Sequence, residues 1–344
     1  MAIIKKYEID MLNVGAADAF LIHAFTMNED GTETEYVILV DAGNEGDGEK
    51  IFNHIQYYYS QRYIDLVIIT HCDADHYGGM KYLVEKHSNQ QNLFKIGEVW
   101  IQDPYKHVDI DDVKYVRKNE TLRDRLNAAY LFNDGSNLLD VLDAAGIYRR
   151  EVFSGYRRDS LNISVLGPDL DYYESLIPEF RVNLDFKEEQ KDEVYNNLVC
   201  YGSTEDDFYS KVLEDANDDN SAVNQSSIVF LFEADDHKMI FTGDAGKAAL
   251  HRIVDRDTKQ DLVNISWLKV PHHGSKHNLD NAIISHFHPS CSYISTEKMG
   301  KYANQCTINA LKKVGCVYST HKSGSMLHHH NTQIRKEYST AESL

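Results

Sequence analysis

Ile64-Asp65-Leu66-Val67-Ile68-Ile69-Thr70 runs directly into His71-Cys72-Asp73-Ala74-Asp75-His76-Tyr77-Gly78-Gly79, and this stretch decides how the rest of the chain is interpreted. Its first part is almost continuously apolar, which is typical of a strand buried on both faces. Its second part places four metal-competent side chains within six residues, namely His71, Asp73, Asp75 and His76. Ionised carboxylates at the end of a core strand are costly to bury without a cation. The stretch therefore predicts a metal site, followed by a glycine pair that lets the backbone turn tightly into a helix.

The segments around this stretch alternate between strand-like and helix-like patterns, which indicates a layered α/β fold. Before it, strands are expected at 9–13, 19–25 and 36–40 and a helix at 49–59. After it, the expected strands are 95–102, 161–166, 227–233, 238–241, 265–270, 291–295 and 316–319, and the expected helices are 77–87, 247–254, 281–286 and 305–314. The metal motif then lies in a loop after a central strand, where ligands usually bind in such sheets.

Two segments fit this rhythm poorly and are interpreted as insertions in a single domain that spans residues 1–344. Segment 104–158 is expected to be helical, and segment 169–222 is expected to be acidic and partly mobile. The acidic segment holds 16 acidic and 4 basic side chains, so it carries most of the net charge of −19. Segment 104–158 holds 10 basic and 9 acidic side chains, and is the expected place for a phosphate-facing surface, although such basic pairs more often lie on a solvated helix face.

The composition sets further bounds on the class of protein. The 344 residues are 42% hydrophobic, which suffices for a large buried core. No apolar run of about 18 residues is present, so neither a membrane span nor a membrane partner is expected, and we expect a cytoplasmic protein. The five cysteines lack Cys-x-x-Cys spacing, which argues against a disulfide framework and a thiolate zinc site.

Two later segments carry side chains that could complete a metal site. Met239-Ile240-Phe241-Thr242-Gly243-Asp244-Ala245-Gly246 ends an apolar strand with an aspartate, and Leu268-Lys269-Val270-Pro271-His272-His273-Gly274-Ser275 ends another with a histidine pair. Each alone is a weak signal, because a strand-end aspartate is often a helix cap and a histidine pair is often a surface feature. The histidines at 321 and 328–330 lack neighbouring carboxylates and are also more typical of a surface.

Taken in this order, the three segments resemble the metallo-β-lactamase-like hydrolase domain of the ComEC competence-protein family, here in a stand-alone form. The resemblance includes segments 13–22, 39–43, 224–229 and 318–320 with Gly324, and it spans residues 9–327. It implies a four-layer αββα sandwich with the metals at one edge between two sheets. Ala16-Ala17 replaces the usual Gln-Gly before Asp18, and that loop is expected to shape the substrate mouth rather than the metal site.

The resemblance also implies the ligand set for two divalent ions. His71 and Asp73 would bind the first ion and Asp75 and His76 the second; Asp244 would bridge them; and His273, or less favourably His272, would complete the second site. Asp41 would orient a ligating histidine. Asp73 stands where a histidine is more common. A carboxylate oxygen is a harder ligand than an imidazole nitrogen, so Mn²⁺ or Mg²⁺ is considered beside Zn²⁺. The family's further histidine is missing, and its loop offers only Asn224, Ser226 and Ser227.

Such a site predicts hydrolysis by a metal-activated water, without a protein nucleophile. Asp75 would orient the attacking hydroxide, and His272, Ser275 or Lys276 would assist the leaving oxygen. By resemblance the substrate is a phosphodiester, with nucleic acid preferred. Two alternatives stay open: a small-molecule hydrolase acting on a cyclic nucleotide, lactone or thioester, and a non-catalytic or conditionally active subunit of a bacterial defence system that binds a protein partner through its insertions. The sequence does not fix the oligomeric state.

Overall fold

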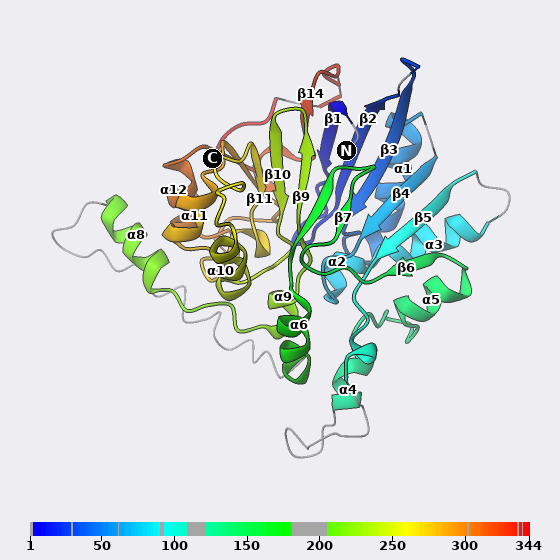
Figure 1. Ribbon diagram of the computed structural model, residues 1–344, viewed down its shortest axis with the longest axis horizontal. Coiled ribbons are helices and arrows are strands. Elements are labelled where there is room, and N and C mark those ends of the chain that lie inside the picture. The colour runs from blue at the N-terminus through cyan, green and yellow to red at the C-terminus, as the bar shows by residue number, and fades with distance from the viewer. Residues whose placement is uncertain are drawn as a thin grey trace.

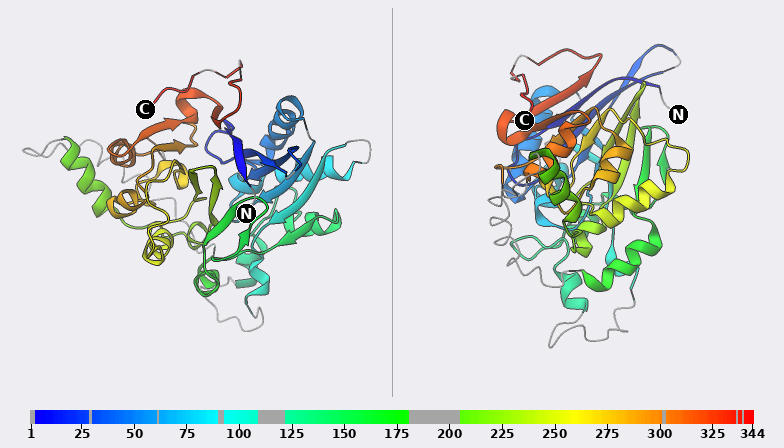
Figure 2. Two further views of the ribbon diagram at one scale, coloured as in Figure 1. Left: turned by 45° about the horizontal axis from the view of Figure 1, so that its top comes forward. Right: turned by 90° about the vertical axis from the view of Figure 1, so that its left-hand side faces the viewer.

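The computed structural model describes residues 3–28, 30–60, 62–89, 93–108, 122–180, 205–300, 303–335, 337–338 and 340–344. Within these residues, two seven-stranded sheets lie face to face, and helices cover both outer surfaces (Figure 1). Strands within residues 4–150, joined by the strand at 326–330, build one sheet, and strands within residues 157–319 build the other; the same layering can be followed in the rotated views (Figure 2).

The first sheet has the order β14-β1-β2-β3-β4-β5-β6 and is parallel from β3 to β6. Its strands are β1 (Ile4–Met11), β2 (Phe20–Met27), β3 (Glu33–Val40), β4 (Tyr63–Ile68), β5 (Lys95–Trp100), β6 (Tyr148–Arg150) and β14 (Met326–His330). Helices α1 (Gly48–Tyr58), α3 (Met80–Ser88) and α5 (Leu138–Ala144) cover its outer face, where Ile51, Leu83 and Leu142 pack against the strands.

The second sheet has the order β13-β12-β11-β10-β9-β8-β7 and is parallel from β10 to β13. Its strands are β7 (Arg157–Arg158), β8 (Ile163–Gly167), β9 (Val229–Ala234), β10 (His237–Phe241), β11 (Trp267–Lys269), β12 (Cys291–Ile294) and β13 (Cys316–Ser319). Helices α10 (Lys247–Arg256), α11 (Asn281–Phe287) and α12 (Gln305–Lys312) cover it.

The inner layer is a continuous apolar core between the two sheets. Phe20, Ile38 and Ile68 point into it from the first sheet, and Phe230, Phe241 and Trp267 point into it from the second. Because side chains alternate along a strand, the intervening residues face the outer helices and form two further apolar layers. The predicted α/β class and four-layer αββα arrangement are confirmed.

The remaining elements are short and lie in connections. They are η1 (Glu45–Asp47), α2 (Ala74–Tyr77), η2 (Pro104–Lys106), α4 (Leu122–Asn127), α6 (Leu170–Leu176), η3 (Ile177–Glu179), α8 (Glu205–Asp215), α9 (Ala222–Gln225), η4 (His272–Gly274) and α13 (Thr320–Ser323). Segment 104–158, expected to be helical, contains α4 and α5 but also β6 and β7, which extend the two sheets. Residues 109–121 and 181–204 of the two expected insertions lie outside the described residues, and the division into one core with two insertions stays a prediction.

None of the helices in the described ranges is long and apolar enough to cross a membrane. This agrees with the absence of a long apolar run in the sequence.

His328 on β14 departs from the expected surface position. Its Nε2 lies 3.3 Å from the Tyr7 hydroxyl and its Nδ1 lies 3.3 Å from the Tyr293 hydroxyl. Burial, reinforced by the neighbouring His237, His329 and His330, lowers the pKa of His328 to about 4. The folded protein therefore holds this imidazole neutral at pH values where an exposed one takes up a proton.

We expect this depressed pKa to make stability depend on pH. An imidazole in the unfolded chain has a pKa of about 6.5, so as the pH falls the unfolded state takes up the proton first and the folded state loses stability. The contribution of His328 to the free energy of unfolding should fall between about pH 6.5 and about pH 4, by up to about 3 kcal/mol, and should then stay constant at lower pH. Urea unfolding of wild type and His328→Gln across this range tests it; parallel pH profiles would contradict it.

Candidate metal centre

The side chains of the candidate centre come from loops at one edge of both sheets. His71 follows β4, His76 lies on α2, Asp244 follows β10 and His273 lies on η4 after β11. In the part of the chain that the structure describes, three groups of histidine and aspartate bring their ligand atoms within 4.8 Å of one another: His71, His76 and Asp244; Asp75, His76 and His273; and Asp18, Asp41 and His76. The topology thus joins the three separated segments in one place.

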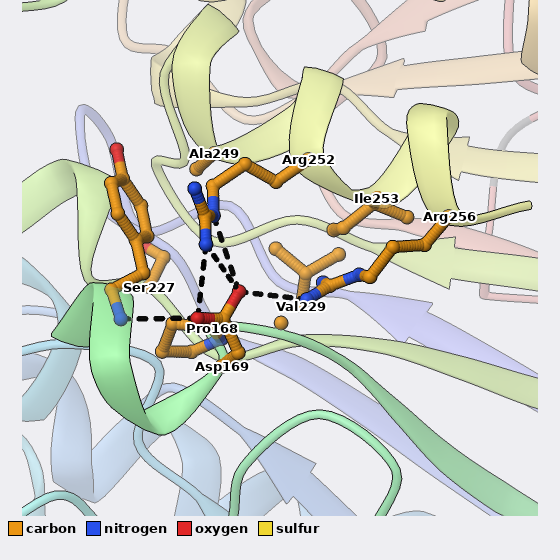
Figure 3. A pocket seen from close by; sticks show the side chains of 10 residues that line it. Pro168, Asp169, Ser227, Val229, Ala249, Arg252, Ile253 and Arg256 are labelled. Carbon is orange, nitrogen blue, oxygen red and sulfur yellow. Dashed lines mark hydrogen bonds and ion pairs between the residues drawn. The ribbon is translucent and has the colours of Figure 1, made fainter.

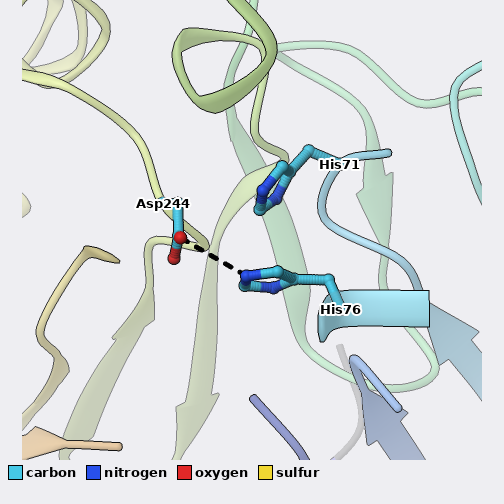
Figure 4. Close-up of side chains that lie close together, drawn as sticks. All are labelled: His71, His76 and Asp244. Atoms are coloured by element: carbon cyan, nitrogen blue, oxygen red, sulfur yellow. Dashed lines mark ion pairs between the residues drawn. The ribbon is translucent and has the colours of Figure 1, made fainter. Parts of the chain in front are cut away.

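His71 and His76 present buried ring nitrogens that are suited to a metal ion. The Nε2 atoms of both side chains make no hydrogen bond, although each is shielded from solvent. Their rings lie 4.1 Å apart between centroids, and both face the carboxylate of Asp244, whose Oδ2 is 3.3 Å from His76 Nε2 (Figure 4). A buried nitrogen without a hydrogen bond is costly, and a bound divalent ion would satisfy both Nε2 atoms. The residues present therefore fit a metal ion.

Asp41 and Thr70 fix the orientation of His76. Asp41 Oδ2 lies 2.8 Å from His76 Nδ1 and accepts a hydrogen bond from the Thr70 hydroxyl, while Asp41 Oδ1 accepts one from the Thr70 backbone N–H. Asp41 adopts a left-handed φ of 56°, which is uncommon for residues other than glycine. Holding Nδ1 in this way directs Nε2 toward Asp244, which is the orienting arrangement that metal-binding histidines usually show.

Asp41→Asn is expected to weaken metal binding while the protein stays folded. The amide replaces the negative acceptor that holds His76, and loss of such an orienting partner typically costs about 10–100-fold in metal affinity. Calorimetric titration of metal-stripped protein with Zn²⁺ measures the effect. Asp65→Asn is a matched control, because Asp65 accepts a hydrogen bond from the Val37 backbone away from the centre. Equal affinity in the two variants would exclude the orienting role.

His273 and Asp75 form the opposite side of the centre. His273 Nδ1 lies 2.9 Å from the Ser295 carbonyl oxygen, and its Nε2 lies 3.4 Å from Asp75 Oδ2 and 4.0 Å from Asp244 Oδ2. Burial alone would raise the pKa of Asp75, but the charges of His76 and His273 outweigh it and hold that pKa well below its ordinary value. His272 and His273 both adopt left-handed φ values, 45° and 52°. Such strain clusters at functional sites and costs about 1–3 kcal/mol per residue.

Asp73 lies at the rim of the centre. Its Oδ2 is 3.6 Å from His71 Nε2, its side chain is 22% exposed, and it belongs to none of the three groups. Cys72 between these residues packs into the apolar layer beneath the first sheet instead. The role of Asp73 as a ligand of the first ion stays a prediction.

Ser227 and Asn224 lie where the family's further histidine is missing. The Ser227 hydroxyl lies 3.4 Å from His71 Nδ1 and accepts a hydrogen bond from the Asp244 backbone N–H. Asn224 is buried, and its Oδ1 makes no hydrogen bond. The Asn224 amide oxygen is therefore the group in this loop that is available as a metal ligand in place of the missing histidine.

Asp18 and Lys269 are part of the centre, and sequence reasoning missed both. Lys269 Nζ forms an ion pair with Asp18 and lies 3.1 Å from Asp244 Oδ1. Asp18 also lies 3.8 Å from both His76 Nδ1 and His273 Nδ1, so the expectation that its loop shapes only the substrate mouth was wrong. A lysine within the apolar run 265–270 was the available signal, because a buried ammonium requires a partner.

His272 turns away from its neighbour His273 and pairs with Asp219. Its Nδ1 lies 2.9 Å from Asp219 Oδ2, which also accepts hydrogen bonds from the side chains of Asn224 and Asn278. Burial alone would lower the pKa of His272, but the hydrogen bond to Asp219 and the charge of Asp244 raise it to about 9. The hydroxyl of Ser275, by contrast, accepts a hydrogen bond from the His277 backbone N–H within the same loop. His272 thus fits a proton donor better than Ser275 does.

The glycine pair after the motif allows close packing rather than a tight turn. A Cβ atom on Gly79 would lie 2.2 Å from the Ala42 carbonyl oxygen, and one on Gly78 would lie 2.3 Å from the Glu45 nitrogen. Both glycines have ordinary helical φ values, −53° and −67°. They let the loop that carries Asp41 approach α2, which holds His76.

Comparison with known proteins gives a family match over part of the chain. Residues 19–139 match the family model described as the metallo-beta-lactamase superfamily. No curated protein matches the sequence.

Among solved structures, the chain is similar to CmlA, a diiron beta-hydroxylase from Streptomyces venezuelae, with 12% identity and a TM-score of 0.42 over 94% of this chain and 53% of that one. This chain thus spans about half the length of CmlA. It is also similar to the metallo-beta-lactamase fold protein YhfI from Bacillus subtilis, with 10% identity and a TM-score of 0.44 over 94% of this chain and 99% of that one. A long form RNase Z from yeast aligns with 12% identity and a TM-score of 0.36, over 85% of this chain and 38% of that one.

Proposed function

We propose that this protein is a metal-dependent hydrolase of the ComEC-like branch that cleaves phosphodiesters with two divalent ions bound at this centre, in the cytoplasm. One observation carries the proposal: the buried Nε2 atoms of His71 and His76 make no hydrogen bond, and both face Asp244. Asp75 and His273 approach the same place from the other side. Such convergence of imidazoles and carboxylates is the usual ligand set of a hydrolytic metal site.

The donor set narrows the choice of metal. Imidazoles suit Zn²⁺, and the three carboxylates of Asp73, Asp75 and Asp244 make the set hard enough for Mn²⁺ and, less favourably, Mg²⁺. We propose His71, Asp73 and the bridging Asp244 for one ion, and Asp75, His76, His273 and Asp244 for the other. Bound divalent cations supply an activated water near neutral pH and neutralise phosphate oxygens.

The protein's own groups would position the reactants. Asp75 is held as a carboxylate between His76 and His273, so it can accept a hydrogen bond from the attacking water. His272, fixed by Asp219, can donate a proton to the leaving oxygen from the rim of the centre, since its side chain is 27% exposed. His272→Ala tests this assignment: if turnover is unchanged, His272 has no such role.

The arginines of the segment expected to face phosphate favour a second candidate, a small-molecule substrate. In the expected phosphate-facing segment, Arg149 pairs with Asp143 and Asp103, and Arg150 and Arg158 pair with Glu98. Arg117 and Lys118 of that segment lie outside the described residues. A long nucleic acid needs cations along its backbone, whereas a cyclic nucleotide, lactone or thioester needs few beyond the metals.

In a small pocket beside Ser227, the arginines are likewise paired with a carboxylate. Its lining includes Asp169, Arg252 and Arg256 (Figure 3). Asp169 accepts hydrogen bonds from both guanidinium groups, at distances from 2.7 to 3.1 Å. These arginines therefore hold Asp169 rather than a phosphate.

A substrate panel with the full chain tests the proposal. Metal-stripped protein is loaded with Zn²⁺ or Mn²⁺ and offered single- and double-stranded oligonucleotides, cyclic dinucleotides, bis(p-nitrophenyl) phosphate, a lactone and a thioester. We expect cleavage of a phosphodiester that a His273→Ala variant lacks. If only the lactone or thioester is hydrolysed, the protein is a small-molecule hydrolase and not a phosphodiesterase. If the protein binds metal but hydrolyses nothing in the panel, the result favours a non-catalytic or conditionally active subunit with a protein partner.

A further inference from the structure

Lys269 is a fully buried ammonium at the base of the candidate metal centre. Its side chain is 2% exposed, and its Nζ contacts the carboxylates of Asp18 and Asp244 and lies 2.6 Å from the Gly243 carbonyl oxygen. An ammonium paired with two buried carboxylates gives the centre a positive charge of its own.

We propose that Lys269, held by Asp18, is a positioning residue that acts as a resident cation: it keeps the carboxylates of the centre together without metal, and it competes with the metal for the charge of Asp244. This inference rests on the proposed metal centre but not on any particular substrate.

The contacts of Asp244 divide its two oxygens between different partners. Oδ1 lies 3.1 Å from Lys269 Nζ and accepts a hydrogen bond of 3.2 Å from the His272 backbone N–H. Oδ2 lies 3.3 Å from His76 Nε2 and 4.0 Å from His273 Nε2. Lys269 thus pairs with Oδ1, while Oδ2 faces the imidazoles that would share a metal with Asp244.

The group of Asp18, Asp41 and His76 at the back of the centre already contacts a cation, the Lys269 ammonium. Asp18, Asp41 and His76 have the spacing of a metal site, but the Lys269 ammonium forms its ion pair with the same Asp18 Oδ2 that faces His76. Asp18 and Asp41 are 0% and 1% exposed, and removing the partner of a buried charge is strongly destabilising. We therefore assign this group to the lysine rather than to a third ion.

Three variants separate a resident cation from a purely structural lysine. Lys269→Met removes the positive charge, Asp18→Asn removes the negative partner, and the double variant removes both. If Lys269 competes with the metal, the affinity for Mn²⁺ should rise by about tenfold in Lys269→Met, fall by about tenfold in Asp18→Asn and return close to wild type in the double variant. Calorimetric titration of metal-stripped protein gives the affinities.

Thermal unfolding of the same proteins gives the second readout. Metal-free Lys269→Met should melt lowest, and its melting temperature should rise more on adding Mn²⁺ than that of wild type. A structural role alone would lower stability and metal affinity together. Lys269→Met with weaker Mn²⁺ binding, or Asp18→Asn with unchanged or tighter binding, would overturn the inference; Asp18→Asn keeps the test decisive if Lys269→Met does not fold. Wild type that binds neither Mn²⁺ nor Zn²⁺ would instead overturn the metal centre, and wild type that binds metal without hydrolysis would overturn only the proposed function.

Discussion

Replacing Asp244 with asparagine is expected to lower kcat/KM by about a thousandfold or more, the largest effect on activity that we predict. Asp244 directs one carboxylate oxygen toward the Nε2 atoms of His76 and His273, and its other oxygen pairs with Lys269. An amide loses the charge shared with the metals, and metal ions contribute several kcal/mol of charge stabilisation in such sites. Steady-state kinetics on the phosphodiester from the substrate panel, with metal content measured alongside, tests this expectation.

Asp236→Asn is the matched control for this substitution. Asp236 is exposed in the turn between β9 and β10, at the opposite end of the strand that leads to Asp244. Its activity and metal content should equal those of wild type. Wild-type activity in Asp244→Asn would contradict the proposed role of this carboxylate.

Arg335→Met is expected to cost about 3–5 kcal/mol of stability, because it removes the guanidinium that pairs with two buried carboxylates. Glu8 and Asp10 on β1 are 8% and 0% exposed, although they point to the outer face of the first sheet. Arg335 donates hydrogen bonds to both and stacks over the ring of Tyr58 at 4.5 Å. This guanidinium, together with the Tyr338 hydroxyl that donates a hydrogen bond to Asp10, attaches the C-terminal segment to the sheet.

Urea unfolding of Arg335→Met beside Arg157→Met measures this cost. Arg157 has a half-exposed side chain and lies 3.7 Å from Asp159, so its loss should change the free energy of unfolding by less than about 1 kcal/mol. If the two variants lose similar stability, the buried pair with Glu8 and Asp10 does not hold the fold together.

Most of the core strands were predictable, because their apolar patterns are local. The predicted strand at 316–319 has the observed bounds of β13, and the runs at 227–233 and 291–295 lie within one or two residues of β9 and β12. Strand β14 was missed, because its sequence Met-Leu-His-His-His lacks an apolar alternation and it becomes a strand only by pairing with β1. Strands β6 and β7 are too short for any pattern.

The candidate site was predictable where its residues are adjacent in sequence. The cluster from His71 to His76 is recognisable because four metal-competent side chains fall within six residues, and the resemblance added Asp244 and His273. Asp18, Lys269 and Asp219 were not found, because each acquires its role from a partner far along the chain: Lys269 for Asp18, and His272 for Asp219. A single charged residue within a strand or loop does not reveal which partner the fold will supply.

Anomalous X-ray diffraction from crystals grown with Mn²⁺ or Zn²⁺ tests the central claim most directly, since it locates the ions and their ligands together. We predict ions bound by His71, Asp73, Asp75, His76, Asp244 and His273, with metal–nitrogen and metal–oxygen distances of about 2.0–2.2 Å. Anomalous density elsewhere, with these six side chains contacting only one another, would contradict the assignment of this cluster as a hydrolytic metal centre.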